Sequence, residues 1–303
     1  MGRKPRTSSR RNQVAKPTNY REGKLDASRP DSRPALIALL LVVILIGSGL
    51  YLTSMVDTEE TVVNPTYGVE AELVTNSHNA EPGGETDFIL LIKNTGSVTD
   101  TFTVSKSNDG GFSINIESGY QTLMLGKDAR KPLIINVKTS ASAEGLLYAF
   151  MEVTSGGDST KKAEVKLNVN TESDFGNLTK IGDTVNVHYA GILASNAKLF
   201  DSSMEYIWDN YMYRRDGVTD SNRHIDTLQA RNIGCTNEGD PSDNCNGSKG
   251  MIEGFDNKMI GMYEGQTLAV RIPAGQAYGE AGSSSSDLAG EDLIFIIEMV
   301  NIN

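Results

Sequence analysis

The sequence predicts a mainly β protein with one membrane helix ahead of two further domains, a β-sandwich and an α+β domain. Three observations predict this arrangement. A charge-free apolar stretch occupies residues 34–56, and seven short alternating runs separated by turn residues occupy residues 66–171. The last segment, residues 175–303, again reads as strands but contains one short helical pattern. At 303 residues, the chain has room for two ordinary domains with some residues left over.

Composition and charge exclude several classes of protein. Hydrophobic residues make up 38% and charged residues 22%, which excludes a fully disordered chain and a many-span membrane protein. The 2 cysteines are too few for a disulfide-stapled mini-protein or a multi-zinc domain. Of the net charge of −11, residues 1–33 carry +7 and the rest carries −18. Because residues 34–303 are this acidic, they would repel the phosphates of DNA or RNA, and we expect no nucleic-acid partner.

The apolar stretch at residues 34–56 is long enough to cross a membrane. Its 23 positions span about 34 Å as a helix, against a hydrocarbon core of about 30 Å. Ten basic residues precede it in a tail, residues 1–33, that we expect to be disordered, and acidic residues follow it. The positive-inside tendency then predicts a single-pass protein in the cell membrane, with a cytoplasmic N-terminus and the later domains outside.

A cleaved signal peptide is the alternative for this stretch. The basic region is longer than usual for a signal peptide, and no good A-x-A site follows the apolar run. Ser48 and Gly49 are small enough to leave cleavage open, but we favour an uncleaved anchor in the lipid bilayer.

An exterior location bears on the two cysteines. Cys235 and Cys245 lie ten residues apart in a stretch rich in Gly, Asn, Asp and Ser, and an oxidising compartment would let them form a disulfide. A metal pair and free thiols are the alternatives. No further Cys or His at ligand spacing supports a metal, so we predict a disulfide and no metal site.

Residues 66–171 predict an antiparallel sandwich of immunoglobulin-like type. Seven strand-like runs in about 105 residues alternate with breakers such as EPGGE, NTGS and SNDGG. The stretch PGGETDFILLIKNTGSVTDTFTV is similar to the CARDB-like modules of prokaryotic surface proteins. No catalytic constellation occurs here, which leaves two interpretations, a spacer above the membrane or a surface that recognises a partner or client.

Three blocks in the last segment carry a specific pattern. GDTVNVHYAGILASNAKLFDSS covers residues 182–203, GMIEGFDNKMIGMYEGQTLAVRIPAGQAYGE covers residues 250–280, and LIFIIEMVNI covers residues 293–302. The first block resembles the V-x-V-H-Y-x-G…F-D-S-S pattern of FKBP-type peptidyl-prolyl cis-trans isomerases, and the second resembles their G-x-I-x-G…G-M-x-x-G pattern followed by I-P-x-x-x-A-Y-G. The third block reads as a final buried strand. The resemblance implies a five- or six-stranded antiparallel sheet wrapped around one short helix over residues 175–303.

The resemblance also implies a substrate pocket and assigns roles to its residues. It places Phe255 as the floor beneath the proline ring and Tyr189, Phe200 and Phe295 as walls. The backbone N–H of Ile252 and the hydroxyl of Tyr278 are implied to bind substrate carbonyls, and Asp201 to polarise the site. The full set is Tyr189, Phe200, Asp201, Met251, Ile252, Phe255, Tyr278 and Phe295. This chemistry needs no cofactor.

Two features depart from the family pattern. The loop at residues 279–292 is polar where relatives have an apolar rim, which predicts a wetter pocket. An insertion over residues 204–249 opens with four aromatic residues in eight positions. We expect it to cover the sheet edge or to present a client-binding surface. An acidic run at residues 238–244 lacks the spacing of a known calcium loop.

These features together predict an enzyme, a peptidyl-prolyl cis-trans isomerase that assists the folding of exported or surface proteins. Its partners would be unfolded or proline-containing polypeptides. One alternative is a surface module that binds proline-containing segments, or acts as a chaperone, with little or no catalysis. The other is a structural surface protein in which residues 66–171 do the main work.

Overall fold

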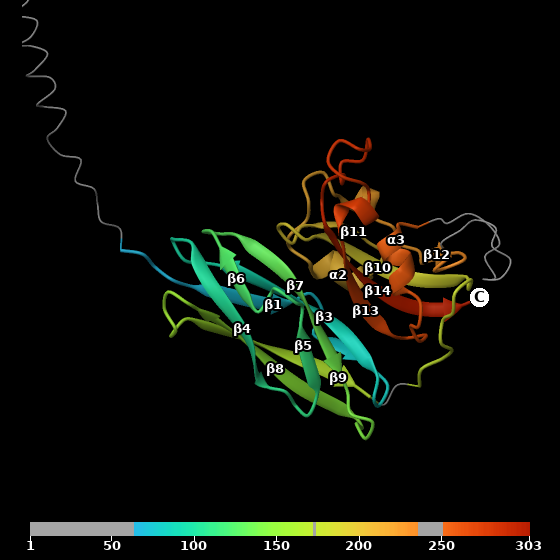
Figure 1. The fold of residues 1–303 in the computed structure, drawn as a ribbon, viewed down its shortest axis with the longest axis horizontal. Helices are drawn as coiled ribbons and strands as arrows, with labels where there is room; N and C mark the ends of the chain where they lie inside the picture. Colours follow the sequence, from blue (N-terminus) through green and yellow to red (C-terminus); the bar gives the residue numbers. More distant parts are fainter. Residues whose placement is uncertain (1–63, 172–173, 236–250) are drawn as a thin grey trace, which may run out of the picture. The chain divides into compact units, whose positions relative to one another are not determined.

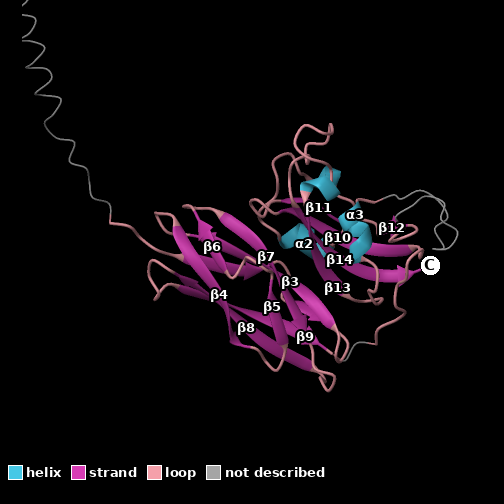
Figure 2. Ribbon diagram, viewed as in Figure 1, coloured by secondary structure: helices cyan, strands magenta, loops and turns pink. Residues whose placement is uncertain are grey.

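The computed structural model describes residues 64–171, 174–235 and 251–303, so the predicted tail and membrane span lie outside it. Strands form most of the regular structure in these ranges, and the helices are short (Figure 2). The prediction of a mainly β protein is therefore confirmed. None of the helices in the described ranges is both long and apolar enough to cross a membrane.

Nine strands between residues 64 and 171 form two sheets. The strands are β1 (Val69–Leu73), β2 (Ser77–Asn79), β3 (Glu85–Asn94), β4 (Asp100–Asn108), β5 (Ser113–Ile116), β6 (Thr122–Leu125), β7 (Arg130–Lys138), β8 (Leu146–Ser155) and β9 (Lys162–Asn170). One sheet has the order β1-β3-β7-β5 and the other β2-β9-β8-β4-β6 (Figure 1). The two strands beyond the seven predicted are β2 and β6, whose 3 and 4 residues are too short for alternation to show in the sequence.

The apolar run in β3 explains how this sandwich relates to the rest of the described chain. Phe88, Leu90 and Ile92 enter the core between the two sandwich sheets. Ile89 and Leu91 point the other way and enter a second apolar cluster, which includes residues of the C-terminal sheet. A strand buried on both faces needs a continuous apolar run rather than an alternating one, and FILLI in β3 has that character.

The C-terminal part contains a five-stranded antiparallel sheet and short helices. Its elements are β10 (Val185–Leu193), β11 (Leu199–Ser202), α2 (Glu205–Asn210), the 3-10 helix η1 (Asp220–Asn222), β12 (Leu228–Ala230), α3 (Glu253–Lys258), β13 (Thr267–Ile272), the 3-10 helix η2 (Ala274–Gln276) and β14 (Leu293–Ile302). The strand order is β11-β10-β14-β13, and β12 pairs with the start of β10. Alternate residues of each strand face opposite sides of this sheet.

The two faces of this sheet have different partners. On one face, Val187 and Tyr189 of β10 pack with Phe255 of α3 in the domain core. On the other face, Ala190 and Ile192 of the same strand pack with the insertion and with β3 of the sandwich. The site described below lies on the first face, and the insertion and β3 pack on the second face.

The sandwich also supplies hydrogen bonds to the edge strand of the C-terminal sheet. The Thr86 hydroxyl donates to the Thr267 carbonyl at 2.8 Å, and the Ala269 N–H donates to Asp87 Oδ2 at 2.8 Å. Lys258 of α3 lies 3.3 Å from the same carboxylate. Because an edge strand leaves backbone groups without a strand partner, these side chains replace the missing neighbour.

Removing the Asp87 carboxylate should destabilise the folded chain. Asp87→Ala leaves the buried Ala269 N–H without its acceptor, which costs about 1–3 kcal/mol of unfolding free energy. Urea unfolding followed by the fluorescence of Trp208, the 1 tryptophan of the chain, measures the difference. As a control, Glu144→Ala at an exposed position between β7 and β8 should change stability by less than about 0.5 kcal/mol. Equal effects of the two substitutions would contradict this role for Asp87.

The buried His78 of β2 should make stability depend on pH. Burial lowers the pKa of His78 to about 4, and its ring meets Phe88 edge-on at 4.6 Å. The unfolded chain then binds the proton more readily between pH 6.5 and about 4, so stability is lost as pH falls through this range. Between pH 7 and pH 4, the unfolding free energy of the wild type should fall by about 3 kcal/mol more than that of His78→Gln. A constant difference between the two proteins across this range would contradict the prediction.

Candidate active site

A cavity of about 320 Å³ lies on the face of the C-terminal sheet that packs against α3. It collects residues from β10, β11, the start of α3, the segment after η2 and β14. Its lining consists of Tyr189, Phe200, Asp201, His224, Leu228, Met251, Ile252, Phe255, Tyr278 and Phe295. All eight residues that the sequence placed in a pocket are in this set, and His224 and Leu228 are additional.

Aromatic rings in edge-to-face contact form the base and walls of the cavity. Phe255 is 1% exposed, and its ring centroid lies 5.0 Å from Phe295 and 6.2 Å from Tyr189, each at nearly 90°. Phe200 meets Phe295 in the same way at 5.5 Å. Such contacts hold each ring in one orientation, so the base of the cavity is preformed.

Two glycines allow these elements to approach closely. A Cβ on Gly191 of β10 would lie 2.3 Å from the Phe200 ring, so only glycine lets that ring lie over the strand. A Cβ on Gly254 would lie 2.7 Å from Ile272 of β13, so glycine also lets α3 pack directly on the sheet. These glycines belong to the sequence blocks from which the pocket was predicted, and the structure supplies a steric reason for both.

Asp201 and Tyr189 form the polar pair of the cavity. The Tyr189 hydroxyl donates to Asp201 Oδ2 at 2.5 Å across the β10–β11 pair. Burial, followed by the hydrogen bond to Asp201 and its charge, raises the pKa of Tyr189. The hydroxyl therefore keeps its proton at neutral pH and acts as a donor. Asp201 Oδ1 is buried and has no hydrogen-bond partner in the described part of the chain.

Two further donors border the cavity. Ile252 precedes the first turn of α3 in an extended conformation, and its N–H has no acceptor among the described residues. Burial and then the charge of Asp201 raise the pKa of Tyr278, which is 38% exposed. Its hydroxyl makes no hydrogen bond to any described residue. A ligand carbonyl at this border can therefore accept from either group.

His224 is the polar lining residue that the sequence did not indicate. It lies in the insertion, between η1 and β12, and its Nδ1 is 2.8 Å from Asp201 Oδ2. The insertion falls outside the family patterns, and a single histidine among polar residues has no spacing that would place it. The sequence therefore contains no pattern that would have placed His224 at the cavity.

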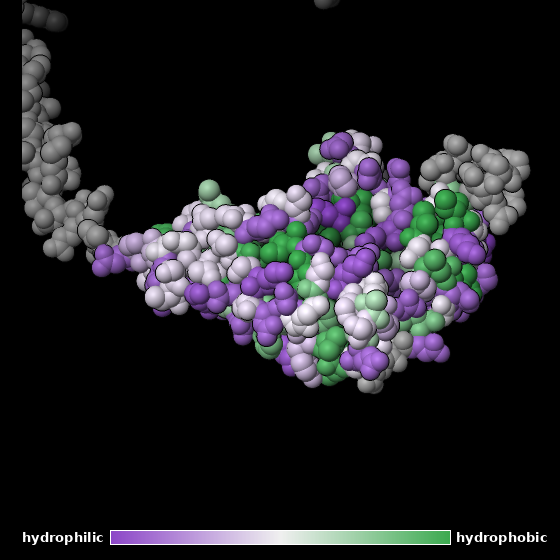
Figure 3. All heavy atoms as spheres, turned by 60° about the horizontal axis from the view of Figure 1, so that its bottom comes forward, coloured by the Kyte–Doolittle hydropathy of each residue, from purple (hydrophilic) through white to green (hydrophobic). Residues whose placement is uncertain are grey.

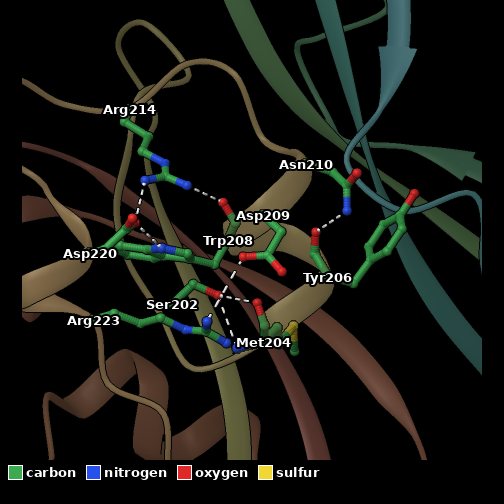
Figure 4. Close-up of polar contacts among 9 residues, drawn as sticks. All are labelled: Ser202, Met204, Tyr206, Trp208, Asp209, Asn210, Arg214, Asp220 and Arg223. Atoms are coloured by element: carbon green, nitrogen blue, oxygen red, sulfur yellow. Dashed lines mark hydrogen bonds and ion pairs between the residues drawn. The ribbon is translucent and has the colours of Figure 1, made fainter.

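The start of the insertion packs on the sheet face opposite the cavity. Trp208 of α2 is 1% exposed, and it joins the apolar cluster of Ala190 and Ile192. Its indole N–H donates to Asp220 Oδ1 at 2.8 Å, and Arg214 lies over its ring and pairs with the same carboxylate (Figure 4). This part of the insertion covers a face of the sheet, whereas the expectation was that it covers the sheet edge; at the edge strand β11, Arg214 pairs with Leu199.

The client-binding interpretation of the insertion stays a prediction. The large hydrophobic side chains Tyr206, Met212 and Ile225 are exposed in it. On the face shown in Figure 3, hydrophobic groups occur in separate places among hydrophilic ones. Exposed side chains of this kind are available to a partner but do not identify one.

The polar loop at residues 279–292 is tied to the insertion. Asp287 pairs with Arg215 at 2.9 Å, and the Arg215 guanidinium also donates to the Asp287 carbonyl at 3.0 Å. Leu288 is buried in the domain core. No residue of the loop is among those that line the cavity, although Tyr278 before the loop and Phe295 after it are. The polar side chains of the loop therefore lie beside the cavity.

The predicted cysteine pair falls partly outside the described residues. Cys235 is 2% exposed and disulfide-bonded. The other cysteine of the sequence, Cys245, lies in residues 236–250, which are outside the described ranges. In the described ranges, no group of three or more His, Cys, Asp or Glu side chains could hold a metal ion.

A larger cavity of about 700 Å³ lies on the opposite side of β10. His188, Glu205, Arg223 and Glu298 are among its lining residues. Ionisable groups of both signs keep such a space hydrated, so it does not suit a reaction that requires an apolar surrounding. The ring-lined cavity is therefore the candidate active site.

The family model described as FKBP-type peptidyl-prolyl cis-trans isomerase matches residues 227–300. The chain is 30% identical over 122 residues to a peptidyl-prolyl cis-trans isomerase, FKBP15-2, of Arabidopsis thaliana, covering 40% of this chain and 55% of the relative. It is 29% identical over 128 residues to an FK506-binding protein of Streptomyces anulatus, covering 42% of this chain and 77% of the relative. A third relative is FK506-binding protein 2 of Yarrowia lipolytica, at 26% identity over 163 residues, covering 52% and 90%.

The family model and these relatives support an FKBP-type peptidyl-prolyl isomerase domain in the C-terminal part of the chain. The chain spans about half the length of the Arabidopsis relative. Among solved structures, the PapD-like domain of human CEP192 is similar at 12% identity and a TM-score of 0.28, covering 35% of this chain and 86% of that one, and a score this low carries no argument.

Proposed function

We propose that this chain is a membrane-anchored peptidyl-prolyl cis-trans isomerase that assists the folding of exported or surface polypeptides. The observation that carries the proposal is the ring-lined cavity, with two donors at its border that have no acceptor among the described residues. Mostly apolar lining with a few placed polar groups is the signature of a small-ligand site. A prolyl ring with its flanking carbonyls has the size and chemistry that such a site accepts.

The cavity can lower the barrier to rotation of an X-Pro bond. That bond favours the trans form by only about 0.5–1 kcal/mol, but rotation must overcome about 18–20 kcal/mol of lost amide resonance. The planar imide has separated charge that water stabilises. Packed on Phe255 and between Tyr189 and Phe295, the imide loses that water, so the less polar twisted form becomes relatively more favourable.

The polar groups of the cavity hold the chain on either side of the proline. In the proposed mode, the Ile252 N–H and the Tyr278 hydroxyl donate to substrate carbonyls and fix one side of the bond while the other turns. Asp201 stands beside the imide with Tyr189 bonded to its Oδ2. No nucleophile takes part, because no covalent bond is broken in the isomerisation.

Tyr278→Phe should lower kcat/KM for a proline tetrapeptide by about fivefold, which corresponds to the loss of a hydrogen bond worth about 1 kcal/mol. A matched control is Tyr148→Phe in β8 of the sandwich, since Tyr148 is 40% exposed and Tyr278 is 38% exposed. The control should retain the wild-type rate. A wild-type chain that binds the peptide without accelerating isomerisation would exclude the enzyme and favour a proline-binding module.

Location is the second part of the proposal. The apolar residues 34–56 would anchor the chain in the bilayer, with residues 1–33 in the cytoplasm and everything after the span outside. The two-sheet sandwich, with its similarity to CARDB-like and immunoglobulin-like surface modules, would then stand in the exterior space. Unfolded exported chains with exposed X-Pro bonds are present there, and their uncatalysed isomerisation takes tens of seconds.

Protease treatment of intact cells that express the full chain tests this location. Cleavage should remove epitopes in the C-terminal domain and spare an epitope placed before residue 34. Opening the cells should then expose the N-terminal epitope as well. A C-terminal domain protected in intact cells would contradict the proposed orientation.

A further inference from the structure

His224 is a part of the candidate active site that the insertion supplies. Its Nδ1 lies 2.8 Å from Asp201 Oδ2 and 3.1 Å from the Tyr189 hydroxyl. Its side chain is 67% exposed and lines the mouth of the ring-lined cavity. The main strands and α3 would form the cavity without it, so this contact is a feature that the extra segment adds.

We infer that His224 is a positioning residue of the isomerase site, which holds the Asp201 carboxylate in place and offsets its charge on gaining a proton. The inference rests on the proposed isomerase activity and adds to it a control of that activity by pH. It also gives the insertion a role at the cavity besides covering the opposite face of the sheet.

The hydrogen bonds determine which atoms change on protonation. Because an ionised carboxylate only accepts, the His224 Nδ1 must carry a hydrogen when it bonds Asp201 Oδ2. In a neutral ring, Nε2 is then the unprotonated nitrogen, and it is Nε2 that gains a proton. Both donors to Oδ2, His224 and Tyr189, are therefore present in either state, and Oδ1 stays without a partner among the described residues.

Protonation of His224 consequently changes the charge of the site, while the hydrogen bonds of His224 and Tyr189 to Asp201 are kept. When an imide twists, its carbonyl becomes ketone-like and the carbonyl carbon becomes poorer in electrons. A carboxylate beside that carbon stabilises it, and a cation on the same carboxylate weakens this effect. Activity should therefore be lower when His224 carries a second proton than when its ring is neutral.

The other ionisable groups near His224 do not duplicate this role. Its neighbour Arg223 lies toward Asp209, at 3.9 Å, and Asp226 on its other side is exposed. Tyr189 and Tyr278, which face the same carboxylate, have raised pKa values and stay neutral across this range. His224 is thus the ionisable side chain in contact with Asp201 that can add a positive charge beside this carboxylate.

The chain has 3 histidines, so the others serve as matched controls. His78 lies in the sandwich, and its pKa, lowered to about 4, keeps it neutral across this range. His188 lies on the opposite face of β10 from Tyr189, where its Nδ1 is 3.2 Å from the Ser203 hydroxyl. A substitution of His188 therefore removes a partly buried histidine from the same strand pair without changing a residue that lines the ring-lined cavity.

The experiment measures kcat/KM of the full chain from about pH 5.5 to pH 8 on a proline tetrapeptide without ionisable side chains, in a protease-free assay. Wild type and His188→Gln should lose about threefold in kcat/KM toward the acidic end. His224→Gln should show a flat profile, and so should Asp201→Asn, because the charge that His224 offsets is then absent. Trp208 fluorescence at each pH verifies that every variant is folded.

A wild-type profile in His224→Gln, or a flat profile in the wild type, would overturn the inference while leaving the isomerase activity intact. Loss of the pH dependence in His188→Gln would also overturn it, since the titrating group would then lie outside the cavity. A wild type without measurable isomerase activity would instead remove the proposed function on which the inference rests.

Discussion

Burial of the Tyr189, Phe255 and Phe295 rings between the C-terminal sheet and α3 is the interaction on which the rest of the site depends. These rings hold one another in fixed orientations and keep water from the base of the cavity. The polar groups act only because of that surrounding, since a hydrogen bond or a charge has a larger effect where water is excluded. The site therefore consists of an aromatic base and a border of donors, with one carboxylate between them.

The alternation of β10 connects this site to the rest of the described chain. Residues on one face line the cavity, and the next residues along the strand pack against Trp208 of the insertion and β3 of the sandwich. The sandwich thus also supports the C-terminal sheet, because Thr86 and Asp87 form hydrogen bonds with the backbone of the edge strand β13. A sheet supported on both faces and at one edge holds its cavity residues in place.

Much of this arrangement followed from local patterns. The lining residues lie in blocks far apart in the sequence, and the resemblance placed them together because β10, β11, α3 and β14 meet at one face of the domain. The short strands β2 and β6 were not predicted, because 3 or 4 residues are too few to show an alternating pattern. His224 was not predicted as a site residue, because the insertion around it shows no regular pattern in the sequence. Only the path of the insertion in the folded chain brings the His224 ring to Asp201. The continuous run in β3 carried the signal of a strand buried on two faces, but a sequence does not identify what covers each face.

Exchange NMR of a proline-containing peptide in the presence of the full chain tests the central claim most directly. It follows the cis and trans forms of the bound and free peptide, together with contacts between prolyl ring protons and aromatic protons of the protein. The account predicts exchange much faster than the uncatalysed process, which takes tens of seconds, and prolyl contacts to the Phe255 ring. Prolyl contacts to this ring with exchange at the uncatalysed rate, or accelerated exchange with the proline seated elsewhere, would contradict it.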